Sequence, residues 1–181
     1  MTPASVMLAD CPWKFGDSLP GNSRGAAKQY DVLDVESLKA FPLPPMADTS
    51  ILFFWRVSAM VEEAYQVVRA WGYVPKSEIV WEKLTKTGKP WFGMGRYVRA
   101  SHETCIVGTR GSFKVKDRGV RSRFSAPVPT DSDGKIIHSA KPDEFYALIE
   151  RLADGPYVEL FARRRREGWE QFGNELPEVT P

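Results

Sequence analysis

The spacing of apolar residues predicts strands that alternate with helices along this chain. Ser5–Leu8 is predicted to be a short buried strand, and the uninterrupted apolar run Ile51–Trp55 is typical of a strand that is covered on both faces. Shorter runs predict further strands at Glu78–Trp81, Thr104–Thr109 and Tyr157–Ala162. Because strands and helices alternate, we expect an α/β protein with a mainly parallel sheet, whose ligands bind at the carboxyl ends of the strands.

Three segments have the spacing and the end signals of helices. Asp34 is suited to cap a short helix that continues to Lys39. Ser58–Trp71 places apolar residues on one face and is followed by a glycine. Pro142–Leu152 combines an early proline and two acidic residues with an apolar stripe. The segment Gly16–Lys28 is rich in Gly, Ser and Asn and is predicted to be a mobile loop.

Length and composition narrow the class of protein. The chain of 181 residues suits a single domain over residues 1–181 that needs no metal or disulfide to fold. The formal charge of +2 is too small to identify a partner. The two cysteines, Cys11 and Cys105, form no metal-binding or disulfide pattern, which favours a reducing compartment. Since no apolar run reaches about 20 residues and no secretory signal is present, we expect a soluble, cytoplasmic protein without a metal cofactor.

The first candidate site is the tetrapeptide Asp10-Cys11-Pro12-Trp13, which directly follows the first predicted strand. An exocyclic amine of a nucleobase is a poor nucleophile because its lone pair is delocalised into the ring. The Asp10 carboxylate and the Cys11 carbonyl could accept its two N–H bonds and localise that pair, while Trp13 stacks on an extruded base. The alternative is an ordinary turn with Asp10 as a cap and Trp13 in the core.

Charged residues near the last helix and the last strand form a second candidate site. Lys141 precedes the helix, where it could hold a carboxylate such as that of S-adenosylmethionine. Glu159 could bind ribose hydroxyls, and Arg163 and Asn174 could hold other polar groups of the same donor. The alternatives are a solvated lysine and a solvated or phosphate-binding arginine loop.

A basic stretch, Arg110–Arg123, is the candidate nucleic-acid contact. Its positive charges can neutralise phosphates while Phe113 and Phe124 stack on bases, and a solvated basic hairpin is the equal alternative. Gly93–Glu103 does not complete a dinucleotide-binding fingerprint, and His102-Glu103 lacks the second histidine of a metalloprotease helix. The basic residues expected to contact nucleic acid are Lys114, Lys116, Arg118, Arg121 and Arg123.

Taken together, these segments resemble the MT-A70 family of N6-adenine methyltransferases in their order along the chain, from Val6 to Leu176. The tetrapeptide Asp10–Trp13 is similar to the catalytic Asp-Pro-Pro-Trp motif of that family, with Cys11 in place of the first proline. The other matching segments are Ile51–Trp55, Ala70–Tyr73, Glu78–Lys83, Gly93–Gly108, Lys141–Glu144, Glu159–Arg163, Trp169 and Gly173-Asn174.

The resemblance implies a Rossmann-like methyltransferase fold, with helices on both faces of the sheet and the catalytic motif before the donor-binding motif. It implies S-adenosylmethionine as the methyl donor, and a target adenine that is bound by Asp10, Cys11, Pro12 and Trp13. It also implies donor contacts from Asp10, Lys141, Glu159, Phe161, Arg163, Asn174 and Glu175.

The resemblance leaves the acceptor and the activity open. The family includes messenger-RNA enzymes and phage or bacterial DNA enzymes, and the small size of this chain favours DNA. The same reaction on RNA is one alternative. An inactive nucleic-acid-binding subunit is the other, because Cys11 does not fix the backbone angle that proline fixes. A homodimer would provide a longer track for nucleic acid.

Overall fold

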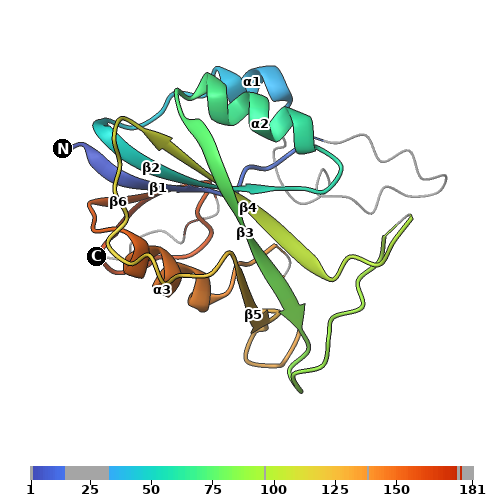
Figure 1. Ribbon diagram of the computed structural model, residues 1–181. Helices are drawn as coiled ribbons and strands as arrows, with labels where there is room; N and C mark the ends of the chain where they lie inside the picture. The colour runs from blue at the N-terminus through green and yellow to red at the C-terminus, as the bar shows by residue number, and fades with distance from the viewer. Residues whose placement is uncertain (1, 15–32, 96, 138, 175, 177–181) are drawn as a thin grey trace.

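A seven-stranded sheet with the order β5-β3-β4-β2-β1-β6-β7 runs through the centre of the protein (Figure 1). The computed structural model describes residues 2–14, 33–95, 97–137, 139–174 and 176, so the loop predicted at Gly16–Lys28 lies outside the described residues. The strands are β1 (Ala4–Ala9), β2 (Met46–Arg56), β3 (Val74–Leu84), β4 (His102–Arg110), β5 (Arg123–Pro127), β6 (Tyr157–Leu160) and β7 (Trp169–Phe172).

All of these strands except β4 run in the same direction. Four pairs of neighbouring strands are parallel: β1 with β2, β1 with β6, β6 with β7, and β3 with β5. β4 is antiparallel to both of its neighbours, β2 and β3. The carboxyl ends of the parallel strands therefore meet at one edge of the sheet, where β4 begins; we call it the carboxyl edge. The arrangement confirms the predicted Rossmann-like α/β fold with a mainly parallel sheet.

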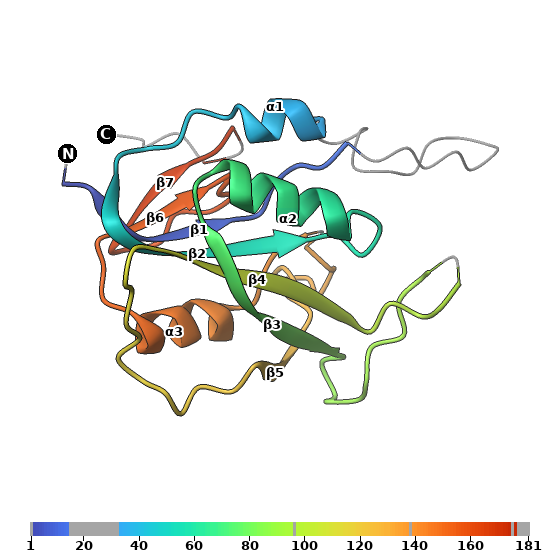
Figure 2. The ribbon, with the colours of Figure 1, turned by 45° about the horizontal axis from the view of Figure 1, so that its top comes forward.

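Helices cover both faces of the sheet (Figure 2). α1 (Val35–Lys39) and α2 (Val61–Ala70) lie on one face, and α3 (Asp143–Leu152) lies on the other. Successive residues of β1 point to opposite faces, so Leu8 packs in the core cluster of α3 and Met7 in the cluster of α1 and α2. Within the described residues, no helix has the length and apolarity needed to cross a membrane.

A few element boundaries differ from the sequence prediction. α2 begins at Val61 rather than at Ser58, which lies in a turn. β6 ends at Leu160, because Phe161 has a left-handed backbone with a φ of 61° that cannot continue a strand. β5 and β7 were not predicted, since strands of five and four residues carry little periodic signal. Asp34 caps α1 as predicted.

Candidate active site

A cavity of about 280 Å³ opens at the carboxyl edge, where several predicted site residues meet. Asp10 directly follows β1, Lys141 lies just before α3, and Arg163 lies shortly after β6. These residues are far apart in the sequence, and the parallel strands bring them to the same place. The lining also includes Cys11, Pro12, Trp13, Trp55 and Glu103.

The ammonium of Lys141 is the centre of an ion-pair network in this cavity. Its Nζ donates to Oδ2 of Asp10 at 2.6 Å and to the carbonyl oxygen of Ser139 at 3.1 Å. Oε2 of Glu103, from the start of β4, lies 3.3 Å from the same Nζ, and Glu103 also pairs with Lys83 at 2.5 Å. An ammonium has three donors; two of them are used in hydrogen bonds to Asp10 and Ser139, and Glu103 adds an ion pair.

The charged groups of the network stabilise one another. Burial alone would lower the pKa of Lys141, whose side chain is 7% exposed, but Asp10 and Glu103 outweigh burial and raise that pKa. Burial alone would raise the pKa of Glu103, but Lys141 and Lys83 lower it below its usual value. Both groups are therefore charged at neutral pH, and Asp10 lies against a lasting positive charge.

The tetrapeptide that follows β1 forms a tight turn. The Trp13 N–H donates to the Cys11 carbonyl at 3.0 Å, a hydrogen bond across Pro12 that suits the fixed φ of proline. The Leu33 N–H donates to the Pro12 carbonyl at 2.8 Å, and the Leu33 carbonyl accepts the Lys14 N–H at 2.9 Å. The Cys11 carbonyl is thus oriented by hydrogen bonds rather than by a proline at its own position.

The side chains of Cys11 and Trp13 are buried. Burial, together with the charge of Asp10, raises the pKa of the Cys11 thiol well above its usual value, so the thiol is neutral at physiological pH. Trp13 is 4% exposed and packs edge-on against Phe54, with ring centroids 5.9 Å apart. The ring that the sequence predicted as a stacking surface therefore belongs to the core while it also lines the cavity.

Two buried indole groups beside the cavity lack a hydrogen-bond acceptor. Among the described residues, the Nε1 atoms of Trp13 and Trp55 are the buried side-chain polar atoms without a partner. Both residues line the cavity, and the Nζ of Lys141 lies 5.2 Å from the centroid of the Trp55 ring. A buried donor without an acceptor is costly, so these two N–H groups destabilise the protein as it stands.

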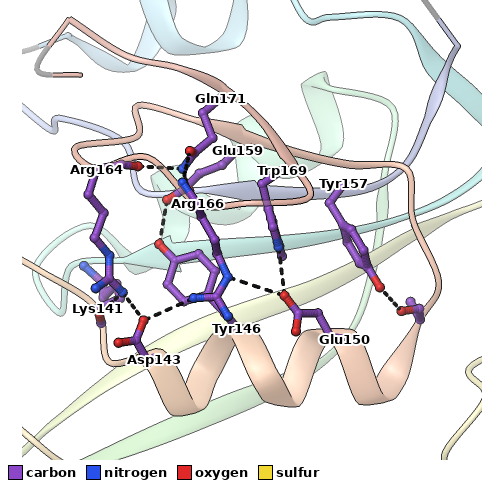
Figure 3. Close-up of polar contacts among 11 residues, drawn as sticks. Lys141, Asp143, Tyr146, Glu150, Tyr157, Glu159, Arg164, Arg166, Trp169 and Gln171 are labelled. Atoms are coloured by element: carbon purple, nitrogen blue, oxygen red, sulfur yellow. Dashed lines mark hydrogen bonds and ion pairs between the residues drawn. The ribbon is translucent and has the colours of Figure 1, made fainter. Parts of the chain in front are cut away.

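A second polar network lies between α3 and the strands β6 and β7 (Figure 3). Tyr146 points from α3 towards Glu159, and its hydroxyl donates to Oε1 at 2.8 Å, while the amide of Gln171 donates to Oε2 at 2.7 Å. Burial raises the pKa of Glu159, and burial with the Glu159 charge raises the pKa of Tyr146. Glu159, which the sequence predicted to bind ribose, thus already accepts two hydrogen bonds from the protein.

The arginine-rich loop after β6 is fastened by the same network (Figure 3). Gln171 accepts the backbone N–H of Arg166 at 2.6 Å and donates to the carbonyl of Arg164 at 2.8 Å. The guanidinium groups of Arg164 and Arg166 both pair with Asp143 in the first turn of α3. Arg163, the loop residue that lines the cavity, is therefore held in place by contacts of its neighbours.

The remaining predicted donor contacts lie at the margin of the cavity or beyond it. Phe161 packs against Phe41 with ring centroids 4.8 Å apart, and its φ of 61° is strained for a residue with a side chain. Ser139, which lines the cavity, has a similar φ of 62°. Asn174 is exposed and is not among the lining residues, and Glu175 lies outside the described residues.

The predicted nucleic-acid contact lies away from the cavity. It begins at the end of β4, on the edge opposite to the carboxyl edge, where the Arg110 guanidinium donates to the Trp71 carbonyl. Lys116 donates its backbone N–H to the carbonyl of Leu152, at the end of α3, and its ammonium pairs with Asp154. Lys114, Arg118 and Arg121 are exposed, and Arg123 at the start of β5 pairs with Glu82 at 3.5 Å.

Sequence reasoning missed three residues of these networks: Glu103, Trp55 and Gln171. Glu103 reaches the cavity because β4 is antiparallel, which places its first residues at the carboxyl edge. Gln171 lies in the short strand β7, which has no periodic signal. No local pattern marks either residue.

In the part of the chain that the structure describes, no group of three or more His, Cys, Asp or Glu residues is arranged to hold a metal ion.

Comparison with known proteins shows the family of this chain. The MT-A70 family profile matches residues 4–175. The N(6)-adenosine-methyltransferase catalytic subunit METTL3 of Homo sapiens is 28% identical over 181 residues, which cover 95% of this chain and 28% of METTL3. The putative N(6)-adenosine-methyltransferase MT-A70-like protein of Medicago truncatula is 28% identical over 183 residues, with coverages of 96% and 26%. The Type II methyltransferase M.MunI of Mycoplasma sp is 26% identical over 196 residues, with coverages of 96% and 78%. The chain thus spans about a quarter of the length of the first two relatives and most of the third.

Proposed function

Because this chain belongs to the MT-A70 family, we propose that it transfers a methyl group from S-adenosylmethionine to the N6 amine of adenine in DNA. The observation that carries the proposal is the contact between Asp10 and Lys141, in a cavity that is also lined by Cys11, Pro12 and Trp13. It joins the catalytic and the donor-binding segments of the resemblance, which are 131 positions apart in the sequence.

The cavity suits the carboxylate end of the methyl donor in charge. Its volume of about 280 Å³ is just below the usual range of small-molecule sites, about 300–1,000 Å³. Lys141 and Arg163 supply positive charge for the carboxylate of the donor. Lys141 donates two hydrogen bonds within the protein, so its remaining donor, which faces the longer contact to Glu103 at 3.3 Å, is the one proposed for a ligand carboxylate.

Other donor contacts follow from the family resemblance. A carboxylate has about four acceptor positions, so Glu159 can accept a ribose hydroxyl in addition to Tyr146 and Gln171. Phe161, Asn174 and Glu175 complete the proposed set. Calorimetry tests the proposal: we expect Lys141→Ala and Asn174→Ala to weaken binding of S-adenosylmethionine. Unchanged affinity in both variants would remove these residues from the donor site.

The residues of the turn suit activation of the amine. When bound, the donor supplies a sulfonium methyl group; the S–C bond breaks with its electron pair left on sulfur, and a bond to N6 forms. Asp10 can accept one N–H of the amine while it holds Lys141, and the Cys11 carbonyl has a second lone pair for the other N–H. These acceptors localise the nitrogen lone pair and stabilise the positive charge that develops before the proton leaves.

The acceptor that we propose is DNA, and RNA is the alternative. M.MunI, a Type II methyltransferase, is matched over 78% of its length. Relatives named N(6)-adenosine-methyltransferases support the RNA reading. The test is transfer of labelled methyl groups to single-stranded DNA, duplex DNA and RNA, followed by nucleoside analysis. Label in N6-methyl-2′-deoxyadenosine is the expected result, and label in RNA alone would reverse the choice. Sedimentation with and without DNA tests the proposed homodimer.

An inactive subunit is the second candidate, and the cysteine at position 11 is the observation that favours it. Both an enzyme and an inactive subunit would bind nucleic acid, so the two candidates are distinguished by binding of the methyl donor and by methyl transfer. An enzyme binds S-adenosylmethionine and transfers label, whereas a subunit of this kind binds nucleic acid without transfer. Binding of the donor in calorimetry together with labelled product would exclude the inactive subunit.

A further inference from the structure

The loop between β3 and β4, Thr85–Ser101, carries a group of exposed apolar side chains. It projects from the carboxyl edge of the sheet (Figures 1 and 2). Phe92 is 73% exposed, and Met94 and Val98 are 87% and 78% exposed. Tyr97 is also exposed. Single exposed apolar residues are common, but several on one short loop mark an interaction surface.

The base of this loop is continuous with the active-site cavity. The Lys83 carbonyl accepts the Trp91 N–H at 2.9 Å, and the Lys83 N–H donates to the Ser101 carbonyl at 2.9 Å. The Gly93 N–H donates to the Ala100 carbonyl at 3.2 Å. Lys83 and Ala100 line the cavity. Phe92 precedes Gly93, which is hydrogen-bonded to Ala100, so Phe92 lies close to the rim of the cavity.

The two arms of the loop are packed closely enough to preform this surface. A side chain at Gly93 would place Cβ 2.3 Å from the Ala100 carbonyl oxygen, and one at Gly95 would place it 1.9 Å from the Val98 carbonyl oxygen. Glycine is therefore needed at both positions. On the outside of the loop, the Arg99 guanidinium lies 4.9 Å from the centroid of the Phe92 ring.

The charge of the loop selects the kind of partner. Thr85–Ser101 contains no Asp or Glu, and Lys86, Lys89 and Arg99 are its basic residues within the described part. Exposed aromatic and arginine groups that stack on bases, together with lysines that neutralise phosphates, are the features of surfaces that bind single-stranded nucleic acid.

We infer that the face formed by Phe92, Met94 and Arg99 of this loop binds the unpaired nucleotides that flank the target adenine, so that the acceptor is engaged as a single strand. The inference rests on the proposed function, because the adenine in the cavity fixes where the flanking strand must run. It places the main nucleic-acid contact on this loop rather than on the Arg110–Arg123 stretch.

Binding of a fluorescent single-stranded oligodeoxynucleotide with one central adenine tests this inference without the methyl donor. We expect Phe92→Ala and Arg99→Gln each to weaken binding about fivefold or more, because one stacked base is lost. A fully paired duplex of the same sequence should be affected less. Val74→Ala is the matched control: Val74 is an apolar residue, 56% exposed, at the start of β3 on the opposite edge, and it should change nothing.

Steady-state methylation separates this inference from the proposed function. In the loop variants we expect KM for the oligonucleotide to rise about fivefold with kcat nearly unchanged, because the flanking contacts are equal in the ground and transition states. A wild-type chain that methylates no nucleic acid would overturn the proposed function. The binding assay does not depend on methyl transfer, so it would still test whether the loop binds a single strand. The inference is wrong if Phe92→Ala and Arg99→Gln bind the single strand as the wild type does. It is also wrong if they alter only self-association in sedimentation, which would make the loop a protein contact.

Discussion

Replacing Asp10 with alanine removes both the acceptor proposed for the amine and the partner of Lys141. We expect methyl transfer to fall by about 10² to 10³, or about 2.7–4 kcal/mol, by analogy with the loss of one preorganised contact to a transition state. The measurement is kcat on adenine-containing DNA, with circular dichroism and donor calorimetry as controls for folding and binding. Wild-type turnover in Asp10→Ala would disprove the assignment.

Glu103 gives a prediction with a defined pH range. The pKa of Glu103 is lower in the folded protein than in the unfolded chain, where it is about 4.3. The charged carboxylate therefore stabilises the fold at every pH above that unfolded pKa. This stabilisation is lost as the pH falls through the folded pKa. The pKa of Lys141 is raised, so its contribution is complete below about 10.4 and is lost as the pH rises through the folded pKa. Between these limits, we expect Glu103→Gln to lower the free energy of unfolding by about 1–3 kcal/mol.

Urea unfolding of Glu103→Gln and the wild type across the pH range provides the measurement. The difference should be constant near neutral pH and should shrink in strong acid, where the carboxylate of the folded wild type takes up a proton. Glu36→Gln is a control, because Glu36 forms an exposed ion pair with Lys39 within α1. A difference that persists unchanged at the lowest pH would show that Glu103 does not act through its charge.

Cys11 is predicted to act through its carbonyl rather than through its thiol. The buried thiol has a raised pKa and is not a thiolate, whereas the carbonyl is part of the turn across Pro12. We therefore expect Cys11→Ala to keep most of its activity, and Cys11→Pro to be tolerated if the local φ is near the value of proline. Mass spectrometry should find no methylated cysteine. A folded, donor-binding Cys11→Ala variant without activity would point to thiol chemistry instead.

At the level of elements, the contact between α3, β6 and β7 converges on one side chain of β7. Gln171 donates to Glu159 and to the Arg164 carbonyl, and it accepts the Arg166 N–H. Gln171→Ala leaves a buried carboxylate with one donor fewer, and we expect it to cost about 1–3 kcal/mol in the free energy of unfolding. Because the same contacts position the loop of Arg163, affinity for S-adenosylmethionine should fall as well.

Glu170→Ala is the matched control for this element, since Glu170 is the neighbour of Gln171 on β7 and points to the other face of the strand. Denaturant unfolding and donor calorimetry on both variants provide the comparison. A Gln171→Ala protein that loses stability but binds the donor normally would show that the network supports the fold and not the donor site.

For the whole molecule, the Thr85–Ser101 loop and the Arg110–Arg123 stretch are two basic surfaces that make different predictions. Arg118 and Arg121 are exposed, while Arg123 already pairs with Glu82. If the stretch contacts duplex phosphates, neutralising these three arginines lowers affinity for every sequence and reduces the slope of log K against log salt by about 0.9 for each lost contact. An unaltered affinity and slope, measured by anisotropy, would show a solvated face.

The sequence by itself determined three helices, five of the strands and the places where charged residues follow them, but not β5 or β7. Apolar periodicity is a local property, so Ser5–Leu8 and Pro142–Leu152 were predicted within one residue of their ends. Asp10, Lys141 and Arg163 were also predicted as site residues, because each lies next to an element with a clear signal. The MT-A70 resemblance was carried by the same segments in order.

The tertiary structure decided which of these residues meet. Strand direction depends on partners that are distant in the sequence, so the antiparallel β4, and with it the position of Glu103 beside Lys141, left no local signal. The sequence left open whether Trp13 is a stacking surface or part of the core, and its burial was settled by packing against Phe54. Local spacing indicates which face of a strand a residue occupies, but only the packed sheet decides which residues meet at its carboxyl edge.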